Sequence, residues 1–233
     1  MDKTNLKRTL VTLTAPVFFG YMAIGIAFGL LLVQSGYPWW LTPIMSVFMY
    51  AGAAQYMALG LFASGAPLIT VMVTTLLVNI RHIVYGLSLL DKLKGTGKVF
   101  PYLVFALTDE TYALLTGCDC PEDVSPKKFF GSIAVLNHIY WILGGIIGSL
   151  VGVLLPFPLK GIDFALTALF VVLLLEQIQR KKARISAIIG AVCAIFALFT
   201  VGKQNMIIVA LAVGITAEAI LLRKDLPNLR KEQ

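Results

Sequence analysis

The stretch LLVNIRHIVYGLSLL, residues 76–90, determines how the rest of the chain is interpreted. It lies inside a long apolar segment, yet it places Asn79, Arg81 and His82 within four residues. A guanidinium at membrane depth costs roughly 3 kcal/mol on insertion scales, so it normally faces a protein interior or a wet cavity and has a partner. A second apolar segment carries two adjacent carboxylates, Asp109 and Glu110. We therefore expect the two stretches to meet inside a bundle of membrane helices.

The composition is that of a membrane protein. Only 13% of the 233 residues are charged, whereas soluble domains carry about 25%, and the mean hydropathy is +0.87. The net charge of +7 comes from clusters in the first eight residues, at residues 92–98, at residues 180–184 and in the tail from residue 223. Such clusters are typical of cytoplasmic loops and need no nucleic-acid partner. We predict an all-α polytopic integral membrane protein, with residues 1–233 forming one transmembrane domain.

Eight segments approach the length of about 20 apolar residues that a span requires. They cover residues 10–33, 39–63, 67–90, 99–116, 129–155, 162–178, 185–201 and 206–222. Eight simple crossings from an internal N-terminus would put the lysines of residues 92–98 outside, against the positive-inside rule. The sequence therefore predicts six to eight hydrophobic segments, some of them re-entrant.

Residues 39–63 and 129–155 are the predicted re-entrant segments. The first contains Pro43 and the small residues 51–54, and the second contains Gly144, Gly145 and Gly148. If both enter and return on one side, both termini and residues 92–98 are cytoplasmic, while the acidic loop at residues 118–123 is external. Eight simple spans with one loop violating the charge rule are the alternative.

The prolines indicate an internal repeat. Offsets of 85, 88 and 89 residues relate two sets of three, Pro16, Pro38 and Pro67 to Pro101, Pro126 and Pro156. Two inverted three-segment repeats, residues 10–90 and 99–178, would be followed by additional spans at residues 185–222. Inverted repeats with broken segments point to a transporter with its site near the bilayer midplane. Chance recurrence of helix-capping prolines is the alternative.

Arg81 is the strongest candidate for binding an anion, because its planar guanidinium pairs with a carboxylate through two hydrogen bonds. On a helix it aligns with Tyr85 and Ser88, whereas Asn79 and His82 share a neighbouring face. The carboxylate would belong to a substrate or to Asp109. A purely structural ion pair joining two helices is the other interpretation.

Asp109 and Glu110 follow Thr108, and as neighbours on a helix they point in different directions. Either acid is a candidate for the substrate amino group or for a coupling proton, because an apolar setting favours the neutral form of a carboxylic acid. Alternatively, Asp109 neutralises Arg81 while Glu110 reaches an aqueous vestibule.

Three further polar residues complete the candidate set. Gln55 follows small residues that allow either a helix break or close helix packing. Asn137 occupies the matching position in the second half of the chain. Asp163 begins an apolar segment, where stabilisation of a helix N-terminus is its simplest role.

The sequence contains no motif for nucleotide binding, zinc proteolysis or serine hydrolysis. We therefore expect a protein that is not an enzyme and uses no cofactor or metal. Cys118 and Cys120 lack a nearby histidine and are interpreted as loop cysteines. Energy for transport would come from an ion gradient or from the gradient of the substrate.

Five motifs resemble one known family. They are Pro-x-x-x-Gly from Pro16, AGAAQ at residues 51–55, NIRHxxYGxSL at residues 79–89, LTDETYAL at residues 107–114 and GIDFALTALF at residues 161–170. Family members often have Ser-Gly where this chain has Ala51-Gly52. With these motifs the chain resembles the AzlC/YgaZ family, the large subunits of bacterial branched-chain amino acid exporters.

The resemblance implies export of valine, leucine, isoleucine and, as a further candidate, methionine across the bacterial cytoplasmic (inner) membrane. It also implies a second, very small membrane subunit of the AzlD/YgaH type. We expect the export to be coupled to protons. The alternative function is a channel, or a secondary transporter of another small solute, in which Arg81 and Asp109 form a gating pair.

Overall fold

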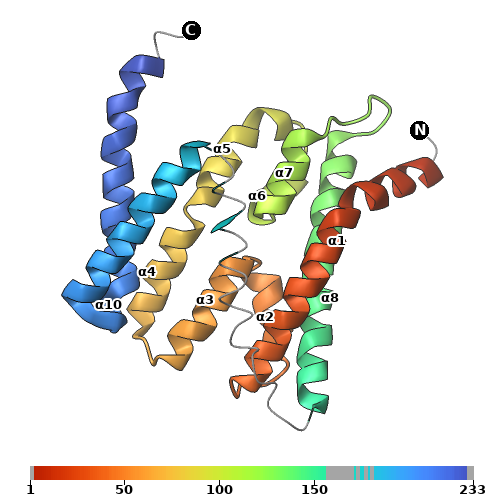
Figure 1. Ribbon diagram of the computed structural model, residues 1–233. Coiled ribbons are helices and arrows are strands. Elements are labelled where there is room, and N and C mark those ends of the chain that lie inside the picture. Colours follow the sequence, from red (N-terminus) through yellow and green to blue (C-terminus); the bar gives the residue numbers. More distant parts are fainter. Residues whose placement is uncertain (1–2, 156–170, 172–173, 176–177, 179–180, 230–233) are drawn as a thin grey trace. The chain divides into compact units, whose positions relative to one another are not determined.

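The computed structural model describes residues 3–155, 171, 174–175, 178 and 181–229 (Figure 1). The elements of this part of the chain are helices, and four helical stretches are long and apolar enough to cross a membrane. They are Asn5–Gln34, Leu68–Leu93, Pro126–Leu154 and Arg184–Gly202. The predicted all-α membrane fold is therefore confirmed.

The chain divides into two compact units. One combines the residues up to Gly60 with those from Val78 through helix α8, and it contains most of the predicted site residues. The other combines residues 61–77 with the C-terminal helix α10 (Lys181–Leu229), in which Gly202 marks a kink with φ of 72°.

Helices α1 (Lys3–Gln34) and α8 (Pro126–Leu154) form the backbone of the first unit. They run in the same direction, because the residue numbers of the contacting pairs increase along both helices. Gly25 contacts Gly144, Gly29 contacts Gly145 and Gly148, and Val33 contacts Gly152. A Cβ atom at Gly29 or Gly148 would collide with the backbone of the other helix. These glycines therefore serve close helix packing.

The prediction that residues 129–155 form a broken, re-entrant segment is wrong. Helix α8 is continuous over 29 residues and is long enough to cross the bilayer. Gly144, Gly145 and Gly148 look like helix breaks in the sequence, but each is buried against α1 or α2.

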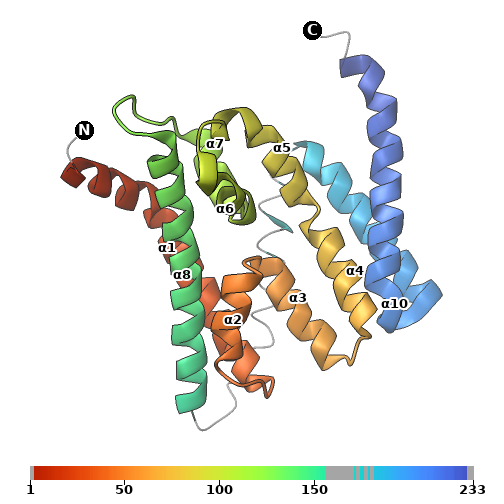
Figure 2. The ribbon, with the colours of Figure 1, turned by 180° about the vertical axis from the view of Figure 1, so that it is seen from behind.

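Residues 39–63 are interrupted, as predicted. Helix α2 (Leu41–Phe48) and helix α3 (Gly52–Ala63) are separated at Tyr50, which has φ of 30°. Helix α2 runs antiparallel to α8, because Thr42 lies beside Gly145 while the Ser46 carbonyl lies 3.1 Å from His138 Nε2. Figures 1 and 2 show α3 turning back toward the end at which α2 began.

A second hairpin lies where the sequence predicted a simple span. The 3₁₀ turn η1 (Gly97–Val99) leads into α6 (Phe100–Phe105), and α7 (Asp109–Gly117) returns to the starting end. Lys92 Nζ, from the end of α5 (Arg81–Leu93), donates to the Thr116 carbonyl at 3.2 Å. In Figures 1 and 2 the loop after α7 lies at the same end of this unit as the start of α1.

This hairpin corrects the predicted topology. Residues 99–116 do not cross the unit, so the acidic loop at residues 118–123 lies at the same end as residues 92–98 rather than opposite them. The inverted repeats of residues 10–90 and 99–178 stay a prediction, since most of residues 162–178 lie outside the described chain.

Helix α4 (Leu68–Asn79) belongs to the second unit for most of its length and leads into α5 of the first. Only Ile80 separates the two helices, and its φ of −57° and ψ of −28° are helical. Together the two helices form the 26-residue candidate span Leu68–Leu93. Arg81 lies 12 residues before the end of α5, roughly 18 Å along the helix.

Candidate functional site

The tips of the two hairpins meet halfway along α8. The Tyr50 ring, at the tip of α2–α3, stacks on His138 with centroids 4.0 Å apart and lies 6.4 Å from Phe105 at the tip of α6–α7. His138 is 12 residues from the start of α8 and 16 from its end, roughly 18 and 24 Å. The tips therefore meet near the middle of a hydrocarbon core about 30 Å thick.

Two helix N-termini lie at these tips, and they differ in charge. Helix α3 has no acidic residue in its first turn, so its N-terminal N–H groups and positive dipole end lack a carboxylate of their own. Helix α7 carries Asp109 and Glu110 in its first turn and is capped by Thr108, whose Oγ1 accepts from the Thr111 N–H at 3.2 Å. One tip is thus suited to an anion and the other to a cation.

Arg81 pairs with Asp109, and so the two stretches meet. Arg81 Nη1 lies 2.9 Å from Asp109 Oδ2, and the Tyr85 hydroxyl donates to Asp109 Oδ1 at 2.7 Å. Tyr85 also stacks on Tyr112, whose hydroxyl accepts from Ser88 at 3.1 Å. The pair is only partly covered, since 32% of the Arg81 side chain and 36% of the Asp109 side chain are exposed.

Glu110 points away from this pair and toward α1. The Tyr21 hydroxyl donates to Glu110 Oε2 at 2.8 Å and lies 2.6 Å from Thr108 Oγ1. Thr108 Oγ1 lies 3.0 Å from Thr111 Oγ1, which accepts from Asn137 Nδ2 at 3.0 Å. A continuous hydrogen-bonded chain therefore runs from the carboxylate to the middle of α8.

Gln55 is fully buried beside this chain. Its Oε1 accepts from Trp141 Nε1 at 2.7 Å, whereas Gln55 Nε2 has no hydrogen-bond partner among the described residues. The same holds, within the described chain, for the buried Asn137 Oδ1. A buried polar atom without a partner is costly, which points to a ligand or a second conformation.

Aromatic side chains form the apolar wall next to Gln55. The ring centroid of Phe28 lies 5.4 Å from that of Tyr56 and 6.4 Å from that of Trp141. The Tyr56 hydroxyl donates to the Ile24 carbonyl at 2.6 Å. Trp141 also covers Gly52, where an added Cβ would touch the indole. The start of α3 is therefore shielded by a large, closely packed side chain.

The structure brings together seven of the ten predicted site residues in two adjoining groups. These are Gln55, Arg81, Tyr85, Thr108, Asp109, Glu110 and Asn137. His82 Nδ1 instead lies 3.0 Å from the backbone carbonyl of Asn79, and the His82 ring contacts Tyr85 edge-on. The buried Asn79 Oδ1 has no hydrogen-bond partner among the described residues. Asp163 lies outside the described residues.

The predicted site residues did not include Tyr21, Tyr50, Thr111 or His138. A tyrosine or threonine in an apolar helix carries no sequence signal of its own, because such residues also satisfy their hydroxyl groups locally. His138 bridges Tyr102, 3.0 Å from its Nδ1, and the Ser46 carbonyl. It thereby joins both hairpins to α8.

These features define a polytopic integral membrane protein with interrupted helices that end at mid-depth. A family model described as AzlC protein matches residues 16–155, so the chain belongs to the AzlC family.

Relatives agree over most of the chain. Bacillus subtilis has a "Branched-chain amino acid transport protein AzlC" that is 34% identical over 94% of this chain and 86% of its own. The "Inner membrane protein YgaZ" of Escherichia coli is 29% identical over 77% of each chain, and an "Uncharacterized membrane protein" of Helicobacter pylori is 43% identical over 91% of this chain and 93% of its own. No solved structure matches.

Proposed function

We propose that this protein is a secondary exporter of valine, leucine and isoleucine, with methionine as a further candidate. The proposal rests on two helix N-termini that lie close together near the middle of the membrane. The first turn of α3 has no acidic residue, whereas the first turn of α7 has two. The name of the Bacillus subtilis relative supports the substrate class.

The two hairpin tips suit a zwitterion. A substrate carboxylate would bind the free N–H groups of α3 and Gln55 Nε2, while the ammonium would bind Asn137 Oδ1 and Glu110. The aliphatic side chain would pack against Phe28 and Trp141. Gln55 and Asn137 are fully buried, so the arrangement described corresponds to a closed state.

Arg81 and Asp109 would act as a gate beside this site. Their charges neutralise each other, which leaves Glu110 to carry the coupling proton through its contact with Tyr21. Arg81 contacts Asp109 through Nη1, while its buried Nε has no hydrogen-bond partner among the described residues, so the guanidinium could bind a substrate carboxylate beside Asp109 or in its place.

The partial exposure of the ion pair favours a small partner subunit. Charges at membrane depth need a protein interior or a wet cavity. The hydrophobic side chains near the pair on the same helix, Ile83, Val84 and Leu87, are 59–63% exposed. A small membrane subunit of the AzlD/YgaH type would cover this face of α5.

The positive-inside rule orients the first unit. Lys7, Arg8, residues 92–98 and the pair Lys127 and Lys128 lie at one end, whereas residues 9–80 contain no charged side chain. We assign this end to the cytoplasm of a bacterium and the chain to its inner membrane.

The test is efflux of leucine and valine from preloaded cells expressing this chain, with and without its small subunit, at two pH gradients. We expect efflux that requires both subunits and follows the proton gradient. Absence of branched-chain efflux under every condition would refute the proposal.

A channel is the second candidate, favoured by the direct 2.9 Å contact of Arg81 with Asp109, which would close a pore. It predicts ionic conductance in planar bilayers without any amino acid present. An absence of such currents from active protein would exclude the channel.

A further inference from the structure

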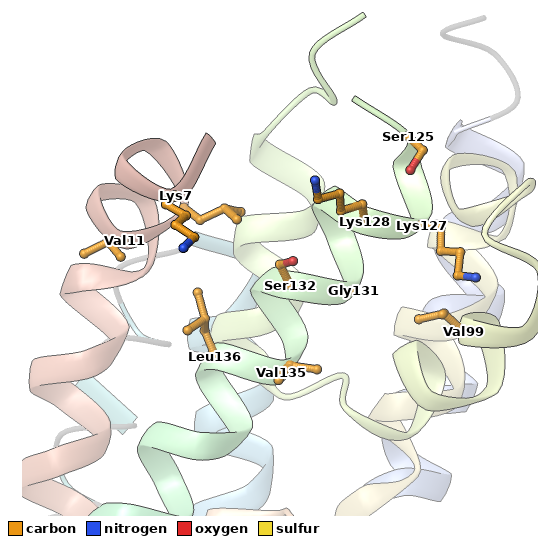
Figure 3. A pocket seen from close by; sticks show the side chains of 11 residues that line it. Lys7, Val11, Val99, Ser125, Lys127, Lys128, Gly131, Ser132, Val135 and Leu136 are labelled. Atoms are coloured by element: carbon orange, nitrogen blue, oxygen red, sulfur yellow. The ribbon is translucent and has the colours of Figure 1, made fainter. Parts of the chain in front are cut away.

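A cavity lies at the end assigned to the cytoplasm, away from the hairpin tips. Its volume is about 780 Å³, and it is bounded by the first turns of α1 and α8 and by η1. Figure 3 shows Lys7 on α1 and Lys128 on α8 above Leu136 and Val135, with Lys127 on the side of Val99. The cavity therefore has basic groups toward the starts of α1 and α8 and apolar side chains further along these helices.

The apolar walls follow from helix periodicity. Lys128, Ser132 and Val135 lie on one face of α8, at spacings of four and three residues. Val135 is 42% exposed, and Val11 on α1 is 56% exposed. Both lie on spans long enough to cross the membrane, so this part of the cavity opens toward acyl chains.

The charge of the cavity has one sign. Its lining includes Lys7, Lys127 and Lys128 and no acidic side chain. Among the described residues, none of these three ammonium groups forms an ion pair. Other lysines at this end do, since Lys92 pairs with Asp119 and Lys94 with Asp91.

We propose that this cavity binds an anionic phospholipid of the cytoplasmic leaflet. The headgroup phosphate would lie between Lys7 and Lys128, with Lys127 at the edge, and an acyl chain would lie along Val11 and Val135. Basic cavities between membrane helices on the cytoplasmic side bind such headgroups. A lipid fits better than a soluble anion, because the apolar walls continue along the two spans.

The test is native mass spectrometry of the purified full chain with added phosphatidylglycerol, cardiolipin or phosphatidylethanolamine. We expect the anionic lipids to be retained at least about tenfold better than the zwitterionic one, since each lysine near the headgroup contributes about fivefold. The triple variant Lys7→Gln, Lys127→Gln, Lys128→Gln should lose this preference, and the corresponding arginine variant should keep it.

The control is Lys94→Gln with Lys98→Gln, which removes two positive charges at the same end of the unit from residues that do not line the cavity. If this control lost the preference for anionic lipids to the same extent, the lipids would be attracted by the overall charge of this end, and the proposal would be overturned. Equal retention of all three lipids by the unmodified protein would overturn it too. Displacement of the lipid by inorganic phosphate alone would also overturn it, because the acyl chain would then contribute nothing. Ser132→Trp, which fills the cavity without changing charge, should reduce retention as well.

Discussion

Asp109 and Glu110 show how two neighbouring residues acquire different partners. Successive residues on a helix point about 100° apart, so one carboxylate faces Arg81 on α5 and the other faces Tyr21 on α1. Because both stand in the first turn of α7, the helix dipole favours their negative charge. The same short motif can therefore serve a gate and a proton site.

Arg81→Ala should reduce leucine efflux at least about tenfold, equivalent to ~1.4 kcal/mol, while the protein remains in the membrane. The reason is that Asp109 loses the only guanidinium within reach in the described chain. Efflux from preloaded cells and membrane immunoblots are the measurements. Lys98→Ala is the control, and near-normal export by Arg81→Ala would refute its role.

Replacing both Arg81 and Asp109 distinguishes a gating role of the ion pair from a purely structural one. Arg81→Gln combined with Asp109→Asn leaves no unpaired charge, so thermal stability should recover relative to either single variant. Efflux should stay low if the charges form the gate. Recovery of both stability and efflux would mean that the pair only joins α5 to α7.

Glu110→Gln should uncouple transport from the proton gradient. The amide oxygen can still accept the hydrogen bond from Tyr21, but the side chain no longer exchanges a proton near neutral pH. Exchange of labelled leucine should persist in proteoliposomes, whereas acceleration by a pH gradient should disappear. Glu122→Gln, in the exposed loop, should behave like the unmodified protein, and a Glu110→Gln variant that still follows the gradient would exclude this residue as the proton carrier.

At the scale of elements, the glycines of α8 pack against α1 and α2 within a continuous helix and do not interrupt it. The sequence predicted an interruption within residues 39–63 and the meeting of Arg81 with Asp109, because small residues and intramembrane charges are local signals. It could not distinguish glycines that break a helix from glycines that pack one. That distinction depends on Gly25 and Gly29, more than a hundred residues away from their partners.

The second hairpin did leave a local signal. Thr108 followed by two acids has the form of a helix start, with a capping hydroxyl and carboxylates in the first turn. This helix start was overlooked when residues 99–116 were predicted to be one span, because the residues on either side of it are apolar enough to form a continuous helix. A hairpin that only half crosses a membrane therefore resembles a full span in composition.

Gly29→Ala should lower the melting temperature in detergent by about 5 °C, because the new methyl group collides with the α8 backbone. Gly20→Ala is the matched control on the same helix, since nothing lies within 4 Å of its added Cβ. Thermal unfolding followed by size-exclusion chromatography gives both values. Similar melting temperatures for the two variants would contradict the close α1–α8 packing.

At the scale of the molecule, the topology predicts which positions share a side of the membrane. In intact cells a membrane-impermeant thiol reagent should not label Cys118 or Cys120, nor a Lys94→Cys variant whose native cysteines are serine. A Ser35→Cys variant, at the far end of α1, should be labelled without permeabilisation. Labelling of Cys118 in intact cells, with the Lys94→Cys variant protected, would restore the simple span of residues 99–116.

The parallel packing of α1 and α8 has a consequence for biosynthesis. The glycine surface of α1 leaves the ribosome 119 residues before its partner, since Gly29 contacts Gly148. At a synthesis rate of about 5–20 residues per second, roughly 6–24 s pass before α8 is available to pack against this surface. During that interval the α6–α7 hairpin, which lies against both helices, can pack against α1 alone. We therefore expect nascent chains that end before α8 to be recognised by membrane quality-control proteases, whereas chains that include α8 escape them.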